Sequence, residues 1–319
     1  MILATYRRPD GRVSIGVVDR ESQRVCDLQQ ADDSKHAPFG SMLQLIQAGP
    51  AGLDRAREVV QRTKWQGSAI ARLEDIKLLS PVPIPEQIRD FTVTELHAKQ
   101  AARGIGRIRS KRLGTPPPPD DIPLPRVIYD QPIYYKGNRF NVIGHDECVR
   151  WPSYSKMLDY ELEFGIFIGR VGKNIPKSQA RDHIFGFSVF NDFSARDAQE
   201  IEMSGPLGPA KGKDFDTGNA IGPWIVTIDE IPDPYKLEMI ARVNGEEWSH
   251  NNSRVMLHTF EDMIAFVSQD ETLYPGEFFG SGTTGNGCGL ELDRWLKAGD
   301  VVELEVERIG VLRNRVVKE

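Results

Sequence analysis

The sequence has few cysteines and no long apolar run. Its three cysteines, Cys26, Cys148 and Cys288, are odd in number and widely spaced along the 319 residues. Such a set provides neither a disulfide framework nor the paired spacing of a metal site, so we expect the reducing cytoplasm. Because the N-terminal residues lack a long apolar core, we expect no signal peptide and no membrane span.

An excess of positive charge is also missing. The formal net charge is −6 and the pI is about 5.7, which argues against nucleic acid as the main partner. The local exception is a basic cluster of Arg103, Arg107, Arg109, Lys111 and Arg112. Such a cluster is typical of a solvated loop, or else it attracts an anionic substrate to a nearby site.

Length and composition predict a folded chain with one large and one small domain. Hydrophobic residues make up 39% and charged residues 27%, which is typical of globular proteins. Residues 80–85 carry proline at alternate positions, which excludes a central strand or a helix. We place the domain boundary at this connector, between a small module of residues 1–80 and a main domain of residues 81–319.

Periodicity predicts an α+β, β-rich fold. Residues 1–80 suggest a hairpin turning at 9–11, a strand near 24–28 and helical segments at 41–48 and 53–63. The second half of the main domain contains many short strand patterns and one clear helical pattern, at 257–268, so we expect a mostly antiparallel sheet structure.

A further helix is expected near residue 95. Thr92 and Glu95 have the spacing of a capping box, which predicts a helix that runs to about Arg103. Residues 104–126, which include the proline-rich stretch 115–125, are expected to form an irregular surface excursion that could act as a lid.

Acidic residues gather in the stretch from Asp159 to Gly218. Glu161 and Glu163 stand two apart among alternating apolar residues, so a strand would point both carboxylates to one face. A second apolar run, at 183–190, delivers Asp192 to its end. Three carboxylates brought together repel one another, and a hard divalent cation would resolve that conflict.

Spacing alone does not make a metal site. Acids two apart recur at Glu303, Glu305 and Glu307, where we expect the solvated face of a strand. What distinguishes the first pair is the set of donors that follows it and would suit an anionic ligand. These donors are Arg196, Gln199, Lys211 and Lys213.

Two further features each have two interpretations. His97, on the expected helix, is either a plain surface histidine or a general base oriented by an acceptor such as Glu291. The segment Gly280–Gly289 has five glycines in ten residues. Its glycines either let backbone N–H groups approach an anion, with a hydroxyl from Thr283 or Thr284, or simply make a flexible connection.

Together these motifs resemble the fumarylacetoacetate hydrolase superfamily over about residues 83–316. The motifs are IRDFTVTELHA, DYELEFGIFIG, NDFSARDAQ, LGPAKGKDFDTGN and GSGTTGNGCGLE. The resemblance implies a catalytic domain built as a mixed β-sandwich roll, preceded by a small N-terminal α+β domain, in a protein that is usually a homodimer. It also implies a divalent metal, Mg²⁺ or Ca²⁺, with Mn²⁺ as a further option.

The resemblance assigns roles residue by residue. It implies four metal ligands, namely Asp90, Glu161, Glu163 and Asp192. It implies catalytic roles for His97, for Glu291 as the group that orients it, and for Lys213. It implies substrate contacts for Arg196, Gln199, Tyr135 and Thr283, while Thr92 stands where the namesake enzyme has a substrate-contacting tyrosine.

Superfamily members act on 2,4-dioxo acids and related acylpyruvates. The resemblance implies a hydrolase that cleaves a carbon–carbon bond through a metal-bound enolate, with water activated by the His97–Glu291 dyad. A decarboxylase, a tautomerase or a dehydratase of 2-keto-3-deoxy sugar acids would use the same site. The alternative from another class is a non-catalytic protein that binds Ca²⁺ or a small acid. The expected partner is a small keto acid, with neither nucleic acid nor membrane.

Overall fold

A computed structural model of the chain describes residues 1–32, 37–205 and 207–318. Within these ranges the strands form a twelve-stranded sheet, a five-stranded sheet and a two-stranded ribbon. Eight α-helices and several short 3₁₀ turns connect or cover them. The α+β, β-rich class predicted from the sequence is therefore confirmed.

The large sheet runs in the order β4-β3-β2-β1-β14-β12-β11-β17-β6-β7, with β5 paired to β1 and β8 to β14. Its strands are β1 (Ile2–Arg7), β2 (Val13–Asp19), β3 (Arg24–Asp27), β4 (Ile70–Arg72), β5 (Lys77–Leu78), β6 (Ile88–Thr92), β7 (Ile133–Gly137), β8 (Val142–Ile143), β11 (Glu163–Ile168), β12 (Ile184–Asp192), β14 (Asn219–Thr227) and β17 (Phe278–Gly280). Most pairs are antiparallel, as predicted, with β17–β6 and β14–β8 parallel.

The smaller sheet runs in the order β16-β15-β18-β19-β9. Its strands are β9 (Cys148–Arg150), β15 (Glu238–Val243), β16 (Glu246–Asn252), β18 (Val301–Val306) and β19 (Gly310–Val317), and the ribbon pairs β10 (Leu158–Asp159) with β13 (Ser194–Ala195). On β18 the apolar residues Val302 and Leu304 are buried, whereas Glu303 and Glu305 remain partly exposed. The prediction of a solvated glutamate face is confirmed for this strand.

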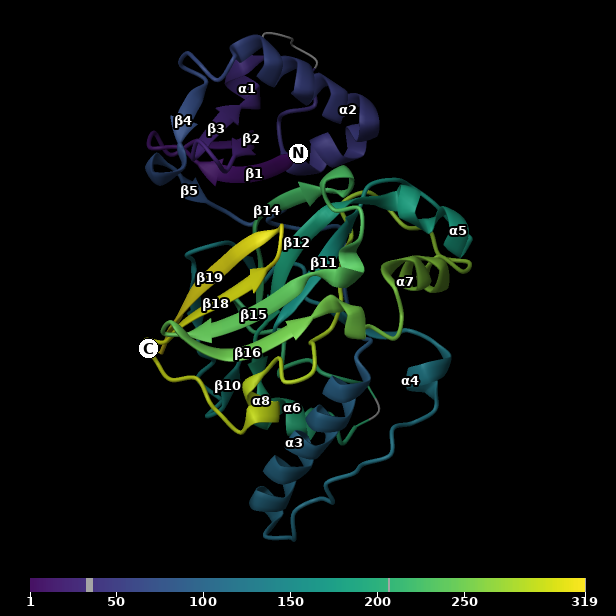
Figure 1. The fold of residues 1–319 in the computed structure, drawn as a ribbon. Coiled ribbons are helices and arrows are strands. Elements are labelled where there is room, and N and C mark those ends of the chain that lie inside the picture. The colour runs from purple at the N-terminus through teal and green to yellow at the C-terminus, as the bar shows by residue number, and fades with distance from the viewer. Residues whose placement is uncertain (33–36, 206, 319) are drawn as a thin grey trace.

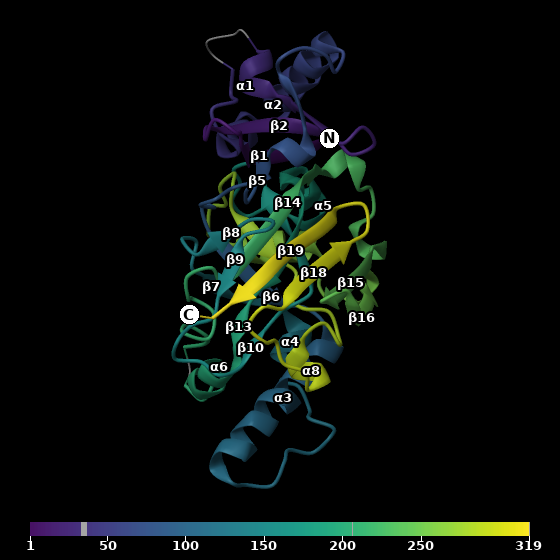
Figure 2. The same ribbon diagram turned by 90° about the vertical axis from the view of Figure 1, so that its left-hand side faces the viewer.

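The helices are α1 (Leu28–Ala31), α2 (Met42–Thr63), α3 (Glu95–Leu113), α4 (Val127–Asp130), α5 (Lys177–Ala180), α6 (Arg196–Glu202), α7 (Phe260–Val267) and α8 (Gly289–Leu292). None of the helices in the described ranges combines the length and the apolar character needed to cross a bilayer. In Figure 1 the segment with α2 lies at one end of the molecule and α3 at the other, and Figure 2 shows the same separation after a quarter turn.

The central strands are buried on both faces, which explains why β12 and β14 are apolar along their whole length. One face of the large sheet packs against β18 and β19 of the smaller sheet. Part of the other face is covered by α2, whose Leu45 and Ile46 join Phe167, Phe190 and Ile225 in a second apolar cluster. Strands covered on both faces have no solvated side and therefore read as continuous apolar runs.

The N-terminal residues continue the large sheet. Leu3 of β1 pairs with Ile225 of β14, and the two predicted helical segments form one element, α2, which breaks at Gly49. Gly49 has a φ of 60°, outside the helical range, and Pro50 follows it. Residues 80–85 adopt neither helix nor strand, as predicted, and the domain boundary at residue 80 stays a prediction.

The predicted start and end of α3 are wrong. Thr92 is the last residue of β6, and the helix follows Thr94, whose side chain makes no capping hydrogen bond. The helix also continues past Arg103 to Leu113, so the predicted irregular excursion is wrong for residues 104–113. The reason is tertiary: a Cβ on Gly104 would lie 2.6 Å from Cγ of Leu290, so this glycine permits close packing of α3 on α8.

Basic residues hold α3 in place. Arg107 donates a hydrogen bond to the carbonyl oxygen of Leu290 (2.7 Å). Nε of Arg109 and Nε of Arg112 donate to the two carboxylate oxygens of Glu200 on α6, at 2.9 and 2.8 Å. For these three arginines neither a solvated loop nor substrate attraction is the right interpretation, because they dock the helix onto its neighbours.

We expect Glu200→Gln to weaken this docking. Glu200 is fully buried, and its hydrogen bonds from Arg112 and Arg109 lower the pKa of its carboxyl below the ordinary value of 4.5. Loss of the charge should reduce the free energy of unfolding by about 1–2 kcal/mol, because two charged hydrogen bonds are weakened. The loss should be no larger than this, because both guanidinium groups also reach solvent. Urea denaturation at pH 7 measures this difference.

The pH dependence of this difference in unfolding free energy tests whether the charge of Glu200 is its cause. A lowered pKa contributes stability that is present above the unfolded-state pKa and is lost as the pH falls through the folded-state value. The difference between the wild type and Glu200→Gln should therefore persist from pH 7 to pH 5 and narrow below pH 4.5. Glu303→Gln, on the partly exposed face of β18, is the control, and an equally large loss there would contradict the assignment.

Candidate active site

Strand directions bring the acidic side chains to one edge of the large sheet. β11 is antiparallel to β12 and β17, and β17 is parallel to β6, so β11 begins where the other three end. The four predicted metal ligands converge there, and each offers an oxygen within 4.8 Å of the others. They are Asp90, Glu161, Glu163 and Asp192, all of them buried.

A glycine makes room for this convergence. Gly280 of β17 lies opposite Asp90 of β6 in the register. A Cβ on Gly280 would lie 2.5 Å from Oδ1 of Asp90 and 2.9 Å from the ring of Phe190. Any larger residue would push the Asp90 carboxylate out of the cluster.

Two cationic side chains enter the same cluster. Nζ of Lys213 donates to Oε2 of Glu161 at 2.8 Å and to Oδ2 of Asp192 at 2.6 Å. The guanidinium of Arg196 pairs with Oε1 of Glu161 at 2.7 Å and, through Nε, with Asp159 at 2.8 Å. The sequence placed both cations near the metal ligands, and the structure brings them there.

The other predicted substrate residues lie around this core. Tyr135 donates to Oδ2 of Asp192 at 2.5 Å, and Thr283 donates to Oε1 of Glu163 at 3.1 Å. Gln199 accepts from Arg196 at 2.9 Å. Thr92 follows Asp90 by two residues on β6 and so shares its face of the strand. Lys211, by contrast, is exposed and lies over the ring of Tyr154.

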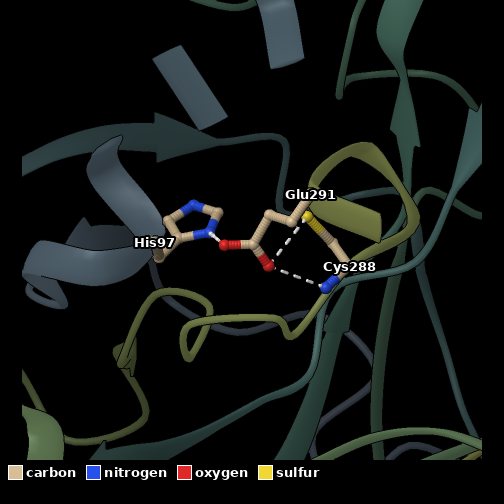
Figure 3. Close-up of side chains that lie close together, drawn as sticks. All are labelled: His97, Cys288 and Glu291. Carbon is tan, nitrogen blue, oxygen red and sulfur yellow. Dashed lines mark hydrogen bonds and ion pairs between the residues drawn. The ribbon is translucent and has the colours of Figure 1, made fainter. Parts of the chain in front are cut away.

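His97 and Glu291 form the predicted pair (Figure 3). Nδ1 of His97 lies 3.1 Å from Oε1 of Glu291, whose Oε2 accepts the backbone N–H of Cys288 at 3.0 Å. Because a carboxylate only accepts hydrogen bonds, Nδ1 carries the proton and Nε2 is the basic nitrogen of the neutral ring. A β-bridge between Glu161 and Cys288 sets this pair beside the carboxylate cluster.

The glycine-rich segment binds an anion that belongs to the protein. Backbone N–H groups of Gly289 and Leu290 donate to the two oxygens of Asp159 at 2.7 and 2.9 Å. A Cβ on Gly289 would lie 2.6 Å from Oδ1 of Asp159, so only glycine allows this approach. Gly289, at the end of the segment, thus makes a backbone contact with an anion, and this anion is a side chain.

The chain is similar in sequence to known proteins. The family model of the fumarylacetoacetate (FAA) hydrolase C-terminal domain matches residues 97–317. The chain belongs to this family. Among curated relatives it is similar to the mitochondrial oxaloacetate tautomerase fahd2 of Xenopus laevis, with 30% identity over 309 residues that cover 95% of this chain and 86% of the relative. It is 33% identical to human mitochondrial oxaloacetate tautomerase FAHD2A over 279 residues, 87% of this chain and 80% of that protein.

Solved structures confirm that the fold is that of the family. The fumarylacetoacetate hydrolase of Exiguobacterium antarcticum has a TM-score of 0.75 and 25% identity over 100% of both chains. Maleylpyruvate hydrolase of Sphingobium sp. SYK-6, solved with manganese(II) and pyruvate, has a TM-score of 0.72 and 23% identity over 100% of this chain and 99% of that one. The second likeness, at this identity, concerns the fold alone.

The carboxylate cluster suits a divalent cation of the kind the family implies. Three oxygens of this cluster have no hydrogen-bond partner among the described residues, namely Oδ1 of Asp90, Oε2 of Glu163 and Oδ1 of Asp192. Buried carboxylate oxygens without a partner are costly, and hard cations such as Mg²⁺, Ca²⁺ and Mn²⁺ prefer oxygen ligands of this type. The oxygens of Glu161 are already held by Lys213 and Arg196, so Glu161 would have to share one of them.

Charge balance leads to the same conclusion. Together with Asp159, five buried carboxylates share two cationic side chains, so negative charge is in excess when all are ionised. Burial and repulsion from Asp192 raise the pKa of Asp90 well above its ordinary value. Burial and repulsion from Asp90 raise the pKa of Glu163 in the same way. Protons on these groups thus relieve the excess that a divalent cation would otherwise offset.

The pKa shifts of Asp192, Glu161 and Lys213 depend on the contacts between the carboxylates and the cationic side chains. Burial raises the pKa of Asp192 to about 6, although Lys213 opposes this shift. For Glu161 burial acts in the same direction, but Lys213 and Arg196 outweigh it and hold its pKa well below the ordinary value. Burial alone would lower the pKa of Lys213, but Asp192 and Glu161 outweigh it and raise the pKa. Lys213 and Glu161 are therefore ionised at neutral pH.

Sequence reasoning missed Asp159. This fully buried residue accepts from Arg196 and from the first residues of α8, and so it connects the cation that holds Glu161 to the helix that carries Glu291. The only signal in the sequence was its position two residues before Glu161, in phase with the two glutamates. That spacing placed Asp159 on the carboxylate face of the strand. Its partner Gly289, however, is 130 residues away and lies outside any local pattern.

We expect Mn²⁺ to stabilise chelator-treated wild-type protein and not Glu163→Gln. An ion at 100 times its Kd should add about 2.7 kcal/mol to the free energy of unfolding. Since burial raises the pKa of Glu163 well above its ordinary value, replacement by the neutral glutamine should change the stability of the metal-free protein little. Thermal unfolding with and without Mn²⁺ measures both quantities, and an undiminished response of the variant would remove Glu163 from the ligand set.

Proposed function

We propose that the protein is a metal-dependent enzyme that hydrolyses a carbon–carbon bond in a 2,4-dioxo acid or acylpyruvate. The observation that carries the proposal is the position of a histidine, oriented by Glu291, beside a buried cluster of carboxylates with unpartnered oxygens. The first supplies a base, and the second a place for a cation. Hydrolysis to a carboxylic acid and an enolate requires both.

His97 is the proposed general base. Its Nδ1 donates to Glu291, so Nε2 is free to accept a proton from water as the water oxygen bonds to a substrate ketone carbon. Glu291 then stabilises the imidazolium, and its own position is fixed by the N–H of Cys288. Cleavage of the carbon–carbon bond leaves its electron pair on the keto acid fragment, which takes up a proton to become the second product.

Asp90, Glu161, Glu163 and Asp192 would hold the divalent cation. When bound, the cation supplies Lewis-acid stabilisation of negative charge on the oxygens of a 2-oxo acid. Lys213, fixed between Glu161 and Asp192, adds a buried positive charge at the same place. A substrate carboxylate or developing oxyanion would be stabilised by this ammonium group.

Keto–enol tautomerisation of a 2-oxo dicarboxylate such as oxaloacetate is the second candidate. It is favoured by the oxaloacetate tautomerases that match this chain over most of its length. The same groups would serve, because His97 would remove a proton from the carbon beside the ketone and return it to the oxygen or the carbon. The two candidates differ in one reactant, since hydrolysis consumes water and tautomerisation does not.

We expect His97→Ala to lower kcat by roughly 10²- to 10⁴-fold, the usual contribution of a general base. Mn²⁺ should still stabilise this variant as it does the wild type, because His97 is not among the proposed ligands. Glu291→Gln, which keeps a hydrogen-bond acceptor but not the charge, should lose less activity than His97→Ala. If His97→Ala turned over acylpyruvate at the wild-type rate, the base assignment would be wrong.

Isotopes distinguish the two candidate reactions. Acylpyruvate hydrolysed in H₂¹⁸O should yield an acid product with one ¹⁸O atom, since the attacking water becomes part of its carboxylate. A tautomerase should instead convert enol-oxaloacetate without incorporation and exchange the C3 hydrogens with D₂O. Mass spectrometry of the products, with a chelator-treated control, reads both results, and exchange without cleavage would favour the second candidate.

A further inference from the structure

A second group of metal-ligand side chains lies beside the carboxylate cluster. His97, Cys288 and Glu291 each offer one ligand atom, and the three atoms lie within 4.8 Å of one another. Nδ1 of His97 is 3.1 Å from Oε1 of Glu291, and Sγ of Cys288 is 3.4 Å from Oε2. Figure 3 shows the three side chains pointing toward one another from α3 and the start of α8.

The chemistry of this group differs from that of the carboxylates. It combines an imidazole nitrogen, a thiol sulfur and one carboxylate oxygen, which is a ligand set for Zn²⁺ rather than for Mg²⁺. Around a tetrahedral Zn²⁺ with bonds of about 2.0 Å to nitrogen and oxygen and about 2.3 Å to sulfur, neighbouring ligand atoms stand roughly 3.3–3.7 Å apart. Nδ1 of His97 and Sγ of Cys288 approach the two different oxygens of Glu291, at 3.1 and 3.4 Å. The carboxylate must therefore turn for one oxygen to bind an ion together with the nitrogen and the sulfur, which all lie within 4.8 Å of one another.

The three ligands also have fixed backbones. Cys288 pairs with Glu161 in a β-bridge, and its N–H holds Glu291. Gly104 packs α3 directly on Leu290, next to Glu291 in sequence. A site whose ligands are held before the ion arrives loses little ordering entropy on binding.

We propose that His97, Cys288 and Glu291 form an inhibitory site for a thiophilic divalent ion such as Zn²⁺. On binding, the Cys288 thiol releases its proton to solvent, and the imidazole changes tautomer, so that Nδ1 loses its proton to the ion's bond and Nε2 carries one instead. The three side chains then provide nitrogen, sulfur and oxygen ligands, with a fourth position left to water. Since Nδ1 of His97 and Oε1 of Glu291 then face the ion, their hydrogen bond is lost. Ion binding is independent of the proposed function, whereas the inhibition rests on it, because it acts through His97.

Co²⁺ is the spectroscopic probe for binding. Added to full-length protein already saturated with Mg²⁺, about one equivalent of Co²⁺ should give the near-ultraviolet charge-transfer absorbance of a thiolate–cobalt bond. Cys288→Ser should abolish this absorbance, while Cys148→Ser, which changes an exposed cysteine outside the group, should retain it. Absence of the absorbance in the wild type, or its persistence in Cys288→Ser, would overturn the proposed site.

Zn²⁺ inhibition is measured on the same proteins at saturating Mg²⁺. The wild type and Cys148→Ser should lose activity at Zn²⁺ concentrations about tenfold or more below those needed for Cys288→Ser, since one strong ligand is missing there. Each inhibition curve is normalised to the activity of the same protein without Zn²⁺, so a change in basal activity in Cys288→Ser does not affect the comparison. Cys288→Ala serves as a second variant. Cobalt–thiolate absorbance without any loss of activity would leave the ion site intact and overturn the role proposed for His97.

Discussion

Burial of like charges is the constraint on which the rest of the site depends. Asp90, Glu161, Glu163 and Asp192 lie in the protein interior, where an unpaired carboxylate is costly. Lys213 and Arg196 offset part of the negative charge, and the raised pKa values of Asp90 and Glu163 indicate that protons offset more of it when no cation is present. The fold holds these groups together because the central strands that carry them are hydrogen-bonded to one another and buried on both faces.

The same constraint links the carboxylate cluster to the histidine. Arg196 touches Glu161 on one side and Asp159 on the other, and Asp159 holds the first turn of α8 through two backbone N–H groups. Glu291 on that turn orients His97. A continuous chain of polar contacts therefore runs from the carboxylates to the base.

The sequence was most informative where the pattern is local. Strand alternation placed Glu161 and Glu163 on one face, and the motif spacing paired His97 with Glu291, because both depend on residues a few positions apart or on the order of family motifs. Gly104 was misread as the end of a helix, since its role is a close contact with Leu290 far along the chain. The Arg109–Glu200 pair and Asp159 were missed for the same reason: their partners are 91 and 130 residues away.

The pairing of β6 with β17 has a consequence beyond the sheet. Asp90 stands opposite Gly280, and only Val93 and Thr94 separate the end of β6 from the helix that bears His97. A slip of one residue in that pairing would turn Asp90 away from its fellow acids and would also rotate and displace the imidazole. The alignment of two short strands thus positions one of the acids directly and also constrains the start of the helix that bears the base.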